Sequence, residues 1–489
     1  MKQLTPLDAQ FLAVETATTT GHVGAVLILD PSTAPGGQLG LAEFRDLWSA
    51  RLHLVPLLRQ RLVEVPLRLG FPYWVDDPHF DVEYHLREIG LPAPGHAGEL
   101  GEQVSRIHAR SLDRSRPLWE AYLIQGLERG RAAVYAKMHH AVIDGVSGAE
   151  ILAAILDVTV EPRMVEPPDQ EWQPEPMPSS LELLGRGAVS SAANIGRVVT
   201  NLPRTLPHVI DLPGAANVPG ARVVSDVADA VQSLVNQQIR PRQADERDLT
   251  APRTPMNGAI TAHRRFSYGS VSLDDVKKVK NAHGLTVNDV VMAMTTTALR
   301  RWLLDHDALP QIPLVAAVPV SIRSEEQHGT SGNQISVMLA HLPTHIADPA
   351  QRLAAVAASM LAAKEQFEAV PASILQDVSA AIPTALSGLA SRALFRLVTT
   401  PGPPFNLFVS NVPGPQLPLY VAGALVEGVH PVSAVTDLTG GLNITLFSYD
   451  GRLDFGLVAC RELVPDVWNL VDYLAEALTE LVALTDAAT

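Results

Sequence analysis

The stretch at residues 132–145 reads AAVYAKMHHAVIDG, and it determines how the rest of the chain is interpreted. Its first part, Ala132 to Met138, is an apolar run with valine and tyrosine, which is typical of a buried strand. That strand delivers the chain directly to two adjacent histidines, His139 and His140. A second apolar run begins a predicted helix at Gly148 to Leu156. The sequence therefore predicts a strand, a short loop that carries both histidines, and a helix.

The loop has a composition that suits proton transfer. Histidine is the side chain whose ordinary pKa lies near neutrality, so it can act as a general base. Because adjacent side chains on an extended backbone point in opposite directions, His139 and His140 cannot both serve one reacting atom. Asp144 lies close enough in a turn to share the neighbourhood of His140, and it could brace the loop by pairing with an arginine. The alternative interpretation is two unrelated histidines beside an aspartate that caps a helix.

The composition favours a large, acidic, two-domain protein. With 489 residues the chain is too long for one ordinary core. Hydrophobic residues make up 47% and charged residues 18%, so a large apolar interior can form. The net charge of −15 argues against nucleic acid as a partner, because contacts to phosphates need a basic surface. The one cysteine, Cys460, excludes an internal disulfide and a cysteine-based metal site.

The N-terminal region does not have the pattern of a secretory signal. Residues 1–15 read MKQLTPLDAQFLAVE, with acidic side chains and no continuous apolar run. No stretch of the chain reaches the roughly 18 to 20 apolar residues that are needed to cross a bilayer. We therefore expect a cytoplasmic protein that could rest on the inner face of the membrane or on a lipid inclusion.

Two changes in composition divide the chain. Residues 161–178 are crowded with proline and acidic residues, which suits an extended connector. Leu181 to Ile239 is rich in alanine and valine and is broken by prolines, so it predicts two or three kinked helices. Its low charge makes it a candidate for contact with lipid, and packing across the two domains is the alternative. We predict an N-terminal domain at 1–160, a connector at 161–250 and a C-terminal domain at 251–489.

Both predicted domains mix strands and helices, which favours an α/β (α+β) fold. The other predicted strands, each an apolar run of suitable length, are His22–Asp30, Trp119–Gly126, Ala262–Tyr268, Pro313–Val320, Ile335–Leu342, Phe405–Ser410, Ala424–Val435, Leu442–Tyr449 and Leu453–Cys460. The other predicted helices, each with helical spacing of apolar residues, are Leu41–Val63, Glu99–Leu112, Leu273–Ala282, Thr286–Leu304, Pro349–Val398 and Pro465–Leu484.

Three short motifs outside the histidine loop also have local interpretations. The RPLW motif at Arg116–Trp119 places a rigid turn and a large aromatic residue before a predicted strand, where Trp119 suits core packing. Thr286 and Asp289 have the spacing of a helix capping box, which explains Asp289 and leaves Asn288 without a role in the cap. The SNVPGP motif at Ser410–Pro415 is a strand that leaves into a tight turn.

The run from His139 to Gly145 resembles the active-site motif of the coenzyme-A-dependent acyltransferase superfamily. That superfamily includes chloramphenicol acetyltransferase, plant acyltransferases and the condensation domains of peptide synthetases. Within it, the chain most resembles the bacterial wax ester synthase/diacylglycerol acyltransferase family. The further segments that match this family, in the right order, are Pro6-Leu7-Asp8, His22-Val23-Gly24, Arg116-Pro117-Leu118-Trp119, Asn257-Gly258, Val287-Asn288-Asp289, Val318-Pro319-Val320-Ser321, Ser410-Asn411-Val412-Pro413-Gly414-Pro415 and Gly441-Leu442-Asn443-Ile444.

The resemblance implies two chloramphenicol-acetyltransferase-like domains, with mixed sheets flanked by helices and the active site at the domain interface. It implies that His140 is the general base, that Gly145 completes the motif and that His139 has a structural or secondary role. It also places Asn288 opposite the catalytic histidine across the interface. There the amide of Asn288 could donate a hydrogen bond to a developing oxyanion.

Further roles follow from the resemblance or from position alone. A similar arginine pairs with the motif aspartate in the superfamily, and Arg323 is the candidate partner of Asp144. The candidate substrate-binding residues, all outside the histidine loop, are Pro117, Trp119, Arg323, Ser410 and Asn411. The densest basic cluster could receive coenzyme A phosphates, or it could be a solvated helix face; its members are Lys277, Lys278 and Lys280.

The expected reaction is direct transfer of a long-chain acyl group from acyl-CoA to a hydrophobic alcohol. Diacylglycerol is the first choice of acceptor and a long-chain alcohol the second, and both require only a wide apolar channel. We expect no cofactor and no metal, because the remaining histidines that we considered have no metal-ligand spacing; these are His283, His328, His341 and His430. Two alternatives stay open. One is a condensation-type enzyme that uses carrier-bound acyl groups and an amine or sugar hydroxyl, and the other is a non-catalytic lipid-binding or droplet protein.

Overall fold

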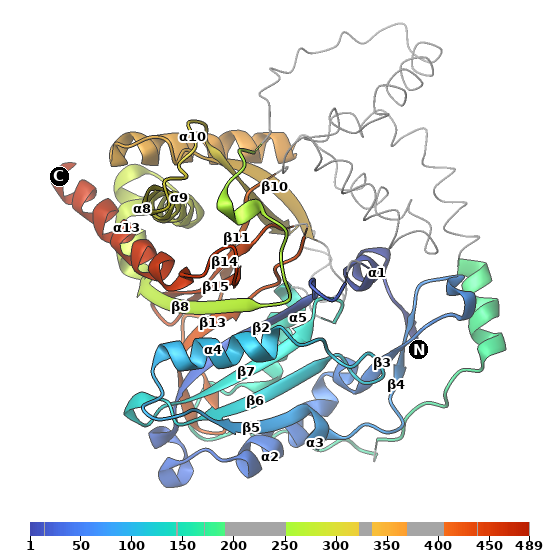
Figure 1. The fold of residues 1–489 in the computed structure, drawn as a ribbon. Helices are drawn as coiled ribbons and strands as arrows, with labels where there is room; N and C mark the ends of the chain where they lie inside the picture. Colours follow the sequence, from blue (N-terminus) through green and yellow to red (C-terminus); the bar gives the residue numbers. More distant parts are fainter. Residues whose placement is uncertain are drawn as a thin grey trace, which may run out of the picture.

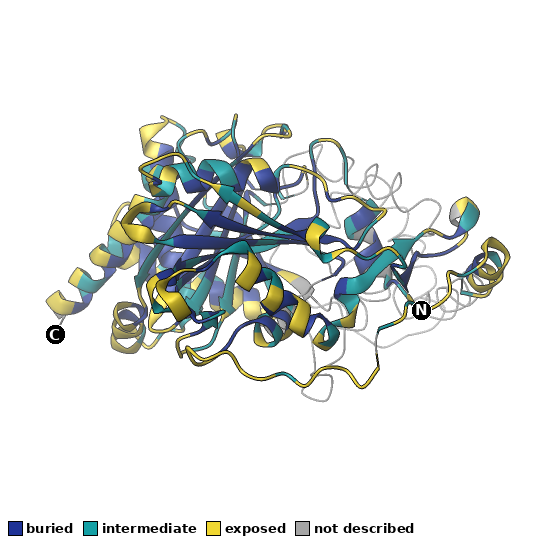
Figure 2. Cartoon of the chain, turned by 90° about the horizontal axis from the view of Figure 1, so that it is seen from below, coloured by how far each residue is buried: buried dark blue, intermediate teal, exposed yellow. Residues whose placement is uncertain are grey.

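The fold is that of a computed structural model, which describes residues 1–13, 15–142, 145–170, 172–190, 251–321, 335–368, 405–437 and 439–488. Within these residues, two six-stranded sheets and one three-stranded sheet form the framework. Helices cover the sheets (Figure 1), and the buried residues gather in the strands and on the inner faces of the helices (Figure 2). The α/β class expected from the sequence, with mixed sheets flanked by helices, is confirmed.

The first sheet carries the histidine loop and has the order β12-β13-β2-β7-β6-β5. Its strands are β2 (His22–Asp30), β5 (Leu86–Gly90), β6 (Trp119–Gln125), β7 (Ala132–His139), β12 (Tyr420–Val421) and β13 (Ala424–Val432). The pairing of β5 with β6 is parallel and the other pairings are antiparallel, so the sheet is mixed. The central strands β2 and β7 end side by side, with His22 opposite His139.

Helices pack on both faces of this sheet. On one face, α2 (Leu41–Arg51), α3 (Val82–His85) and α5 (Gly145–Ile155) form a core with β5, β6 and β7. On the other face lies α4 (Ala97–His108), whose buried apolar residues recur at helical spacing. A Cβ at Gly101 of α4 would lie 2.5 Å from the carbonyl oxygen of Phe266, so glycine is what allows the helix to approach the second sheet this closely.

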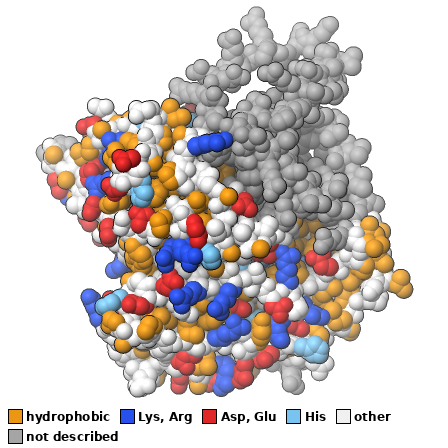
Figure 3. All heavy atoms as spheres, viewed as in Figure 1, with side chains coloured by type: hydrophobic (Ala, Val, Ile, Leu, Met, Phe, Trp, Pro, Cys, Tyr) orange, Lys and Arg blue, Asp and Glu red, His pale blue; other side chains and the backbone are white. Residues whose placement is uncertain are grey.

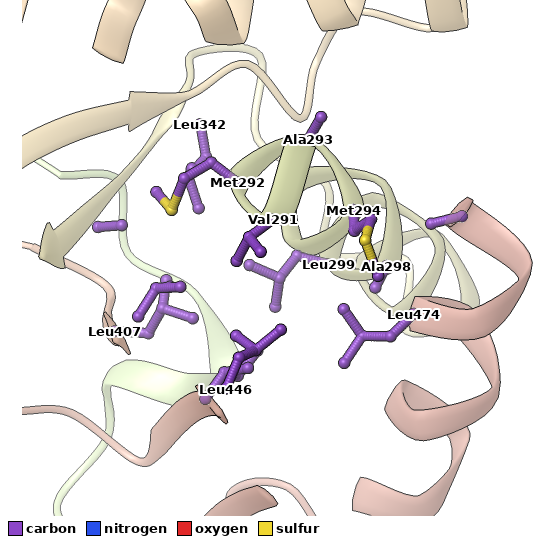
Figure 4. Close-up of a cluster of buried hydrophobic side chains, with 14 of the residues drawn as sticks. Val291, Met292, Ala293, Met294, Ala298, Leu299, Leu342, Leu407, Leu446 and Leu474 are labelled. Atoms are coloured by element: carbon purple, nitrogen blue, oxygen red, sulfur yellow. The ribbon is translucent and has the colours of Figure 1, made fainter. Parts of the chain in front are cut away.

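The second sheet has the order β10-β9-β11-β14-β15-β8, with β11 parallel to both of its neighbours. Its strands are β8 (Arg264–Ser272), β9 (Leu314–Ser321), β10 (Ile335–Leu342), β11 (Leu407–Pro413), β14 (Leu442–Tyr449) and β15 (Arg452–Cys460). The helices α8 (Leu273–His283), α9 (Val287–Asp305), α10 (Pro349–Glu368) and α13 (Val467–Ala488) pack on this sheet and on one another. Figure 4 shows α9 inserted between the sheet and its neighbours, with Val291 and Leu299 near Leu407 and Leu446.

Each six-stranded sheet and the helices that pack on it form one unit of the fold, the first unit around the first sheet and the second unit around the second sheet. One hairpin joins these two units. Although β12 and β13 follow β11 in the chain, they complete the first sheet, because β13 pairs along the edge of β2. The same strand β13 also packs across β14 and β15 of the second sheet. The second half of the chain therefore builds part of the sheet that carries the histidines. The predicted domain boundaries at 160 and 251 stay predictions.

A smaller sheet with the order β1-β4-β3 lies beside the first unit, next to helix α1 (Pro6–Ala13). Its strands are β1 (Lys2–Gln3), β3 (Gln60–Val63) and β4 (Tyr73–Asp76). A helix at 180–190 packs on this sheet through Leu183, which is buried against Val65 and Val75. The rest of the predicted helical segment up to residue 239 lies outside the described residues, as does the end of the predicted 349–398 helical region.

One predicted helix was wrong. The interval Leu41–Val63 holds α2 only as far as Arg51, followed by two short 3-10 turns and by β3. The break has a local cause, because Pro56 has no backbone N–H and disfavours helical angles at Val55, whose φ of −130° and ψ of 76° lie outside the helical region. Strands β3, β4 and β5 were not predicted, because each is short and lacks a long apolar run.

Candidate active site

The histidine loop lies where strand β7 ends. The backbone N–H of His139 donates to the carbonyl of Leu118, and the N–H of His140 donates to the carbonyl of Gly21 at 2.7 Å. The N–H of Ala141 then donates to His139 Nδ1 at 3.0 Å, and the N–H of Val142 donates to the His139 carbonyl at 2.9 Å. These bonds fold residues 139–142 into a tight turn, and α5 begins soon afterwards at Gly145. The predicted order of strand, loop and helix is confirmed.

His140 lies partly buried against the N-terminal helix. Its ring stacks on Phe11 of α1, with the ring centroids 4.0 Å apart and an angle of 14° between the ring planes. Stacking covers one face of the imidazole, whereas the ring nitrogens form their hydrogen bonds in the ring plane. A histidine held in this way keeps its proton-transfer atoms in a fixed direction, which is what a general base requires.

His139 points away from His140, into a buried polar cluster. Its side chain is almost fully buried, and its Nε2 lies 3.2 Å from Oε1 of Glu15. On the neighbouring strand, His22 Nε2 lies 3.7 Å from the same carboxylate oxygen. The ring of His22 meets the ring of His108 edge to face, and His108 Nδ1 lies 2.8 Å from the Tyr135 hydroxyl. The two loop histidines therefore have different surroundings, as expected from an extended backbone.

The charges of this cluster are strongly perturbed by burial and by one another. Burial opposes ionisation of Glu15, but His139, Arg114 and the N–H of Gly21 outweigh it and hold the pKa of the carboxyl well below its usual range. Burial, together with the charge of Lys137, lowers the pKa of His22 and lowers the pKa of His108 to about 3. The same burial lowers the pKa of Lys137 to about 8. Glu15 is therefore a stable anion in a cluster where burial favours the neutral forms of His22 and His108.

The RPLW motif supports the histidine loop through a backbone hydrogen bond and side-chain packing. The carbonyl of Leu118 accepts the N–H of His139, and the Leu118 side chain packs with Ala141 and Val142. Pro117 is buried beside Leu118, where its ring makes the backbone rigid. Trp119 is completely buried between the rings of Trp48 and His85, at 4.8 and 4.5 Å between ring centroids.

The polar atom of Trp119 is also used inside the protein. Its indole N–H donates to the Leu58 carbonyl at 2.8 Å, so both its faces and its polar atom are used inside the protein. Trp119 is therefore a core residue, as its sequence context suggested, and its contact with a substrate stays a prediction. Arg114, just before the motif, donates to Glu15 and to the Leu12 carbonyl, so it joins the motif to the N-terminal segment.

Asn288 is the second residue of α9, in the second unit. Thr286 and Asp289 form the predicted capping box, with the Asp289 N–H donating to the Thr286 hydroxyl and the Thr286 N–H donating to Asp289. The cap therefore uses Asp289 and leaves the half-buried Asn288 for another role. Its role in stabilising an oxyanion stays a prediction.

Ser410 and Asn411 lie half-buried on β11, opposite Thr445 and Leu446 of β14. The turn that follows is closely packed, because a Cβ at Gly414 would lie 2.4 Å from the Phe447 ring. Contact of Ser410 and Asn411 with a substrate stays a prediction. Asp144 and Arg323 lie outside the described residues, so their pairing is also untested.

Several motifs have structural roles that the sequence left open. The side-chain amide of Asn257 donates to the Asn406 carbonyl and accepts from the side-chain amide of Asn406. The Asn257-Gly258 motif therefore fixes the backbone just before β11. Lys277 and Lys278 pair with Asp274 and Asp486, so these two lysines belong to a solvated helix face. Among the described residues, no group of three or more His, Cys, Asp or Glu side chains could hold a metal ion.

The residues that sequence reasoning missed are those that surround the histidine loop from the N-terminal segment. They are Phe11, Glu15 and Gly21. A weak signal was present, because Glu15 is an acid that directly follows the four apolar residues 11–14. Its partner His139 lies far along the chain, so no spacing rule connects them.

Comparison with known proteins identifies the family. The model of the wax ester synthase/diacylglycerol acyltransferase catalytic domain matches residues 4–291, and the model of the C-terminal domain matches residues 331–482. A candidate diacylglycerol O-acyltransferase of Mycobacterium tuberculosis is 37% identical over 490 residues, which span 99% of this chain and 91% of the relative. The chain therefore belongs to the wax ester synthase/diacylglycerol acyltransferase family, and it is an acyltransferase.

Solved structures agree with this assignment. The wax ester synthase/diacylglycerol acyltransferase from Marinobacter aquaeolei VT8 is similar with a TM-score of 0.70 and 31% identity, over 99% of this chain and 100% of that chain. A trichothecene 15-O-acetyltransferase from Fusarium sporotrichioides has a TM-score of 0.56 at 12% identity, over 98% of this chain and 94% of that chain. The second likeness concerns the fold alone. It confirms the acetyltransferase-like architecture that the sequence resemblance implied.

Proposed function

We propose that this acyltransferase transfers a long-chain acyl group from acyl-CoA to the free hydroxyl of diacylglycerol, with His140 as the general base. The observation that carries the proposal is the geometry of His140, at the end of a central strand, on a hydrogen-bonded turn and with its ring stacked on Phe11. The names of the mycobacterial relatives support diacylglycerol as the acceptor. The family name also includes wax ester synthesis, so a long-chain alcohol is the second candidate acceptor.

The proposed reaction needs no acyl-enzyme and no cofactor. His140 accepts the proton of the acceptor hydroxyl, and the oxygen attacks the thioester carbonyl to form a tetrahedral intermediate. The intermediate collapses with loss of the coenzyme A thiolate, which takes the proton from the imidazolium of His140. A positioned base of this kind contributes about 10² to 10⁴-fold to the rate. We propose that Asn288 donates to the oxyanion, an interaction worth about 3 to 4 kcal/mol in comparable sites.

A lipid acceptor also requires contact with a lipid phase. In the described part of the chain, no helix combines the length and the apolar character needed to cross a bilayer. Large apolar side chains are exposed around the small sheet and the 180–190 helix, including Leu67, Leu181 and Val189. Figure 3 shows hydrophobic side chains gathered on this side of the molecule. We propose that this side rests on a membrane surface or a lipid inclusion during turnover.

The function is tested with purified protein and labelled palmitoyl-CoA, offered with diolein or with hexadecanol. We expect labelled triacylglycerol from the wild type, and a fall of about 10² to 10⁴-fold in His140→Ala at an unchanged melting temperature. Label in the wax ester alone would move the acceptor to the second candidate. Absence of product with both acceptors would overturn the proposal, and full activity in His140→Ala would overturn the role of the base.

A further inference from the structure

Glu15 occupies a position that the reaction itself does not explain. It lies between α1 and β2, with only 13% of its side chain exposed. One carboxylate oxygen, Oε1, accepts the backbone N–H of Gly21 at 2.8 Å and lies 3.2 Å from His139 Nε2. The other, Oε2, accepts from Arg114 at 2.6 Å. A nearly buried carboxylate is costly unless each oxygen has partners, and here both oxygens have them.

The contacts of His139 define its protonation. Its Nδ1 accepts the N–H of Ala141, so Nδ1 carries a lone pair and not a proton. The proton of the neutral ring therefore sits on Nε2, which faces Glu15. The carboxylate of Glu15 lies beside that N–H, and its negative charge favours the proton on Nε2 and so keeps the ring in this one tautomer. If Glu15 were absent, the opposite tautomer would become accessible, and it would break the bond that folds the turn at Ala141.

The same carboxylate also holds the backbone beside His140. The N–H of Gly21 donates to Glu15, and the carbonyl of Gly21 accepts the N–H of His140. Glu15 therefore reaches the peptide that carries His140 by two routes, one through Gly21 and the other through His139. The packing is close on both routes, since a Cβ at Gly21 would lie 2.8 Å from His139 Nε2.

The segment from Glu15 to Gly21 is itself tied to the second unit. The carbonyl of Thr18 accepts a hydrogen bond from Arg264 of β8, and the Thr19 hydroxyl lies 3.3 Å from Asp437. Within the segment, the hydroxyl of Thr16 accepts the N–H groups of Thr18 and Thr19. The segment is therefore a braced link between the second unit and the histidine turn.

We propose that Glu15 is a positioning residue for acyl transfer, which fixes the tautomer of His139 and the backbone of Gly21 and thereby sets the orientation of His140. The proposal rests on the proposed function of His140 as the base. Glu15 acts through its neighbours and does not touch the substrates. Misplacing a catalytic group by about 1 Å can reduce a rate by about 10²-fold, so a group that fixes this turn has a large effect on kcat.

The test compares Glu15→Ala with Glu15→Gln and with Glu427→Gln. The amide of Glu15→Gln can place its oxygen where Oε1 accepts from Gly21 and lies beside His139, and it loses only the contact with Arg114, whereas Glu15→Ala removes every contact. Glu427 is a matched control, because its carboxylate also pairs with an arginine, Arg131, at 2.6 and 2.7 Å and far from the histidine turn. Activity is measured with the acceptor that the wild type uses, as kcat and KM separately, together with the melting temperature.

We expect kcat to fall by about 10²-fold in Glu15→Ala, by less than about tenfold in Glu15→Gln, and not in Glu427→Gln. KM for acyl-CoA should stay within about twofold in all three variants, because ground-state binding is not altered. A uniform loss in Glu15→Ala and Glu427→Gln that follows the melting temperature would overturn the proposal. So would wild-type kcat in a folded Glu15→Ala protein.

A second readout does not depend on turnover. In protein with ¹⁵N-labelled histidine, the shifts of His139 should report a protonated Nε2 and a bare Nδ1 in the wild type, and a mixture of tautomers in Glu15→Ala. An unchanged tautomer in Glu15→Ala would overturn the positioning role. If the wild type transferred no acyl group to any acceptor, the proposed function would fail while this measurement still decided the role of Glu15.

Discussion

Phe11 and His140 stack face to face, with ring centroids 4.0 Å apart and 14° between the ring planes. The contact joins the N-terminal helix α1 to the loop that ends β7, two segments that the chain separates by most of the first unit. The stack restricts rotation of the imidazole about its side-chain bonds, because turning the ring would separate the two faces. The proposed base is thus oriented from its face by Phe11 and from its backbone by Gly21.

The stack predicts a selective effect on turnover. An aromatic pair contributes about 0.5 to 1.5 kcal/mol, so Phe11→Leu should reduce kcat by about 2- to 10-fold with little change in KM. Phe80→Leu is the matched control, since Phe80 also stacks on a histidine, His85, at 5.4 Å and 19°. Steady-state kinetics with both variants decide the point. Equal losses of kcat in the two variants would mean that the Phe11 stack has no special relation to the base.

The two loop histidines should respond differently to amide substitutions. In His139→Asn the side-chain oxygen can replace Nδ1 and accept from Ala141, and in His139→Gln the amide N–H can replace Nε2 and donate to Glu15. Each variant keeps one of the two contacts, so each should fold and retain measurable activity. Loss of one buried hydrogen bond should cost about 1 to 3 kcal/mol in the free energy of unfolding.

The same substitutions at His140 should remove the base, with a fall in kcat of about 10² to 10⁴-fold at little cost in stability. Initial rates and denaturant unfolding of all four variants provide the comparison. A folded His139 variant as inactive as His140→Ala would show that His139 takes part in the chemistry.

The sequence predicted what depends on short-range order. The strand at His22–Asp30 has the bounds predicted for it, as do the strands at Ile335–Leu342 and Leu442–Tyr449, because an uninterrupted apolar run between turn residues is a local signal. The strand, loop and helix around His139 followed from the same kind of pattern. The helix predicted from Leu41 to Val63 ended at Arg51, and Pro56, a residue without an N–H, prevented it from resuming despite the spacing of the leucines.

The arrangement of the site depended on contacts that no local pattern contains. The sequence of β13 resembles that of any other buried strand, so nothing in it indicated that it would complete the first sheet. Glu15 and His139 meet only because β2 and β7 are neighbours, with His22 and His139 in register. The sequence favoured a core position for Trp119, but no local pattern indicated its stacking partners Trp48 and His85.

The close packing at Gly21 predicts a further effect. A Cβ there would lie 2.8 Å from His139 Nε2 and 3.4 Å from the Phe11 carbonyl, so Gly21→Ala must displace the imidazole. We expect overpacking to reduce the free energy of unfolding by about 1 to 3 kcal/mol. We also expect kcat to fall by a larger factor than the factor by which KM changes. Gly98→Ala in α4 is the control, because its Cβ would meet nothing within 4 Å and alanine favours a helix. Wild-type kinetics in Gly21→Ala would show that the turn tolerates displacement of His139.

The buried histidines predict a loss of stability below neutral pH. In the folded protein, burial followed by the charges of Lys137 and Arg264 lowers the pKa of His108 to about 3, whereas in the unfolded chain its pKa is about 6.5. Below pH 6.5 the unfolded state therefore binds a proton that the folded state refuses, so the free energy of unfolding falls as the pH falls. Glu15 acts in the same direction but at lower pH, because its pKa is also lowered in the folded protein and the stability that it contributes is present above pH 4.5 and lost only below it.

Between pH 6.5 and 5.5 the histidines therefore dominate, and each fully shifted histidine contributes a slope that rises from about 0.7 kcal/mol per pH unit at pH 6.5 toward about 1.4 kcal/mol per pH unit at lower pH. Urea unfolding at several pH values should show this decline in the wild type and a shallower decline in His108→Gln, whose amide can still donate to the Ser433 carbonyl in place of Nε2. His96→Gln removes an exposed histidine that contacts Glu128 and should leave the slope nearly unchanged. If the free energy of unfolding fell with pH at the same slope in the wild type and in His108→Gln, the prediction would be wrong. The proton that only the unfolded state binds would then belong to another group.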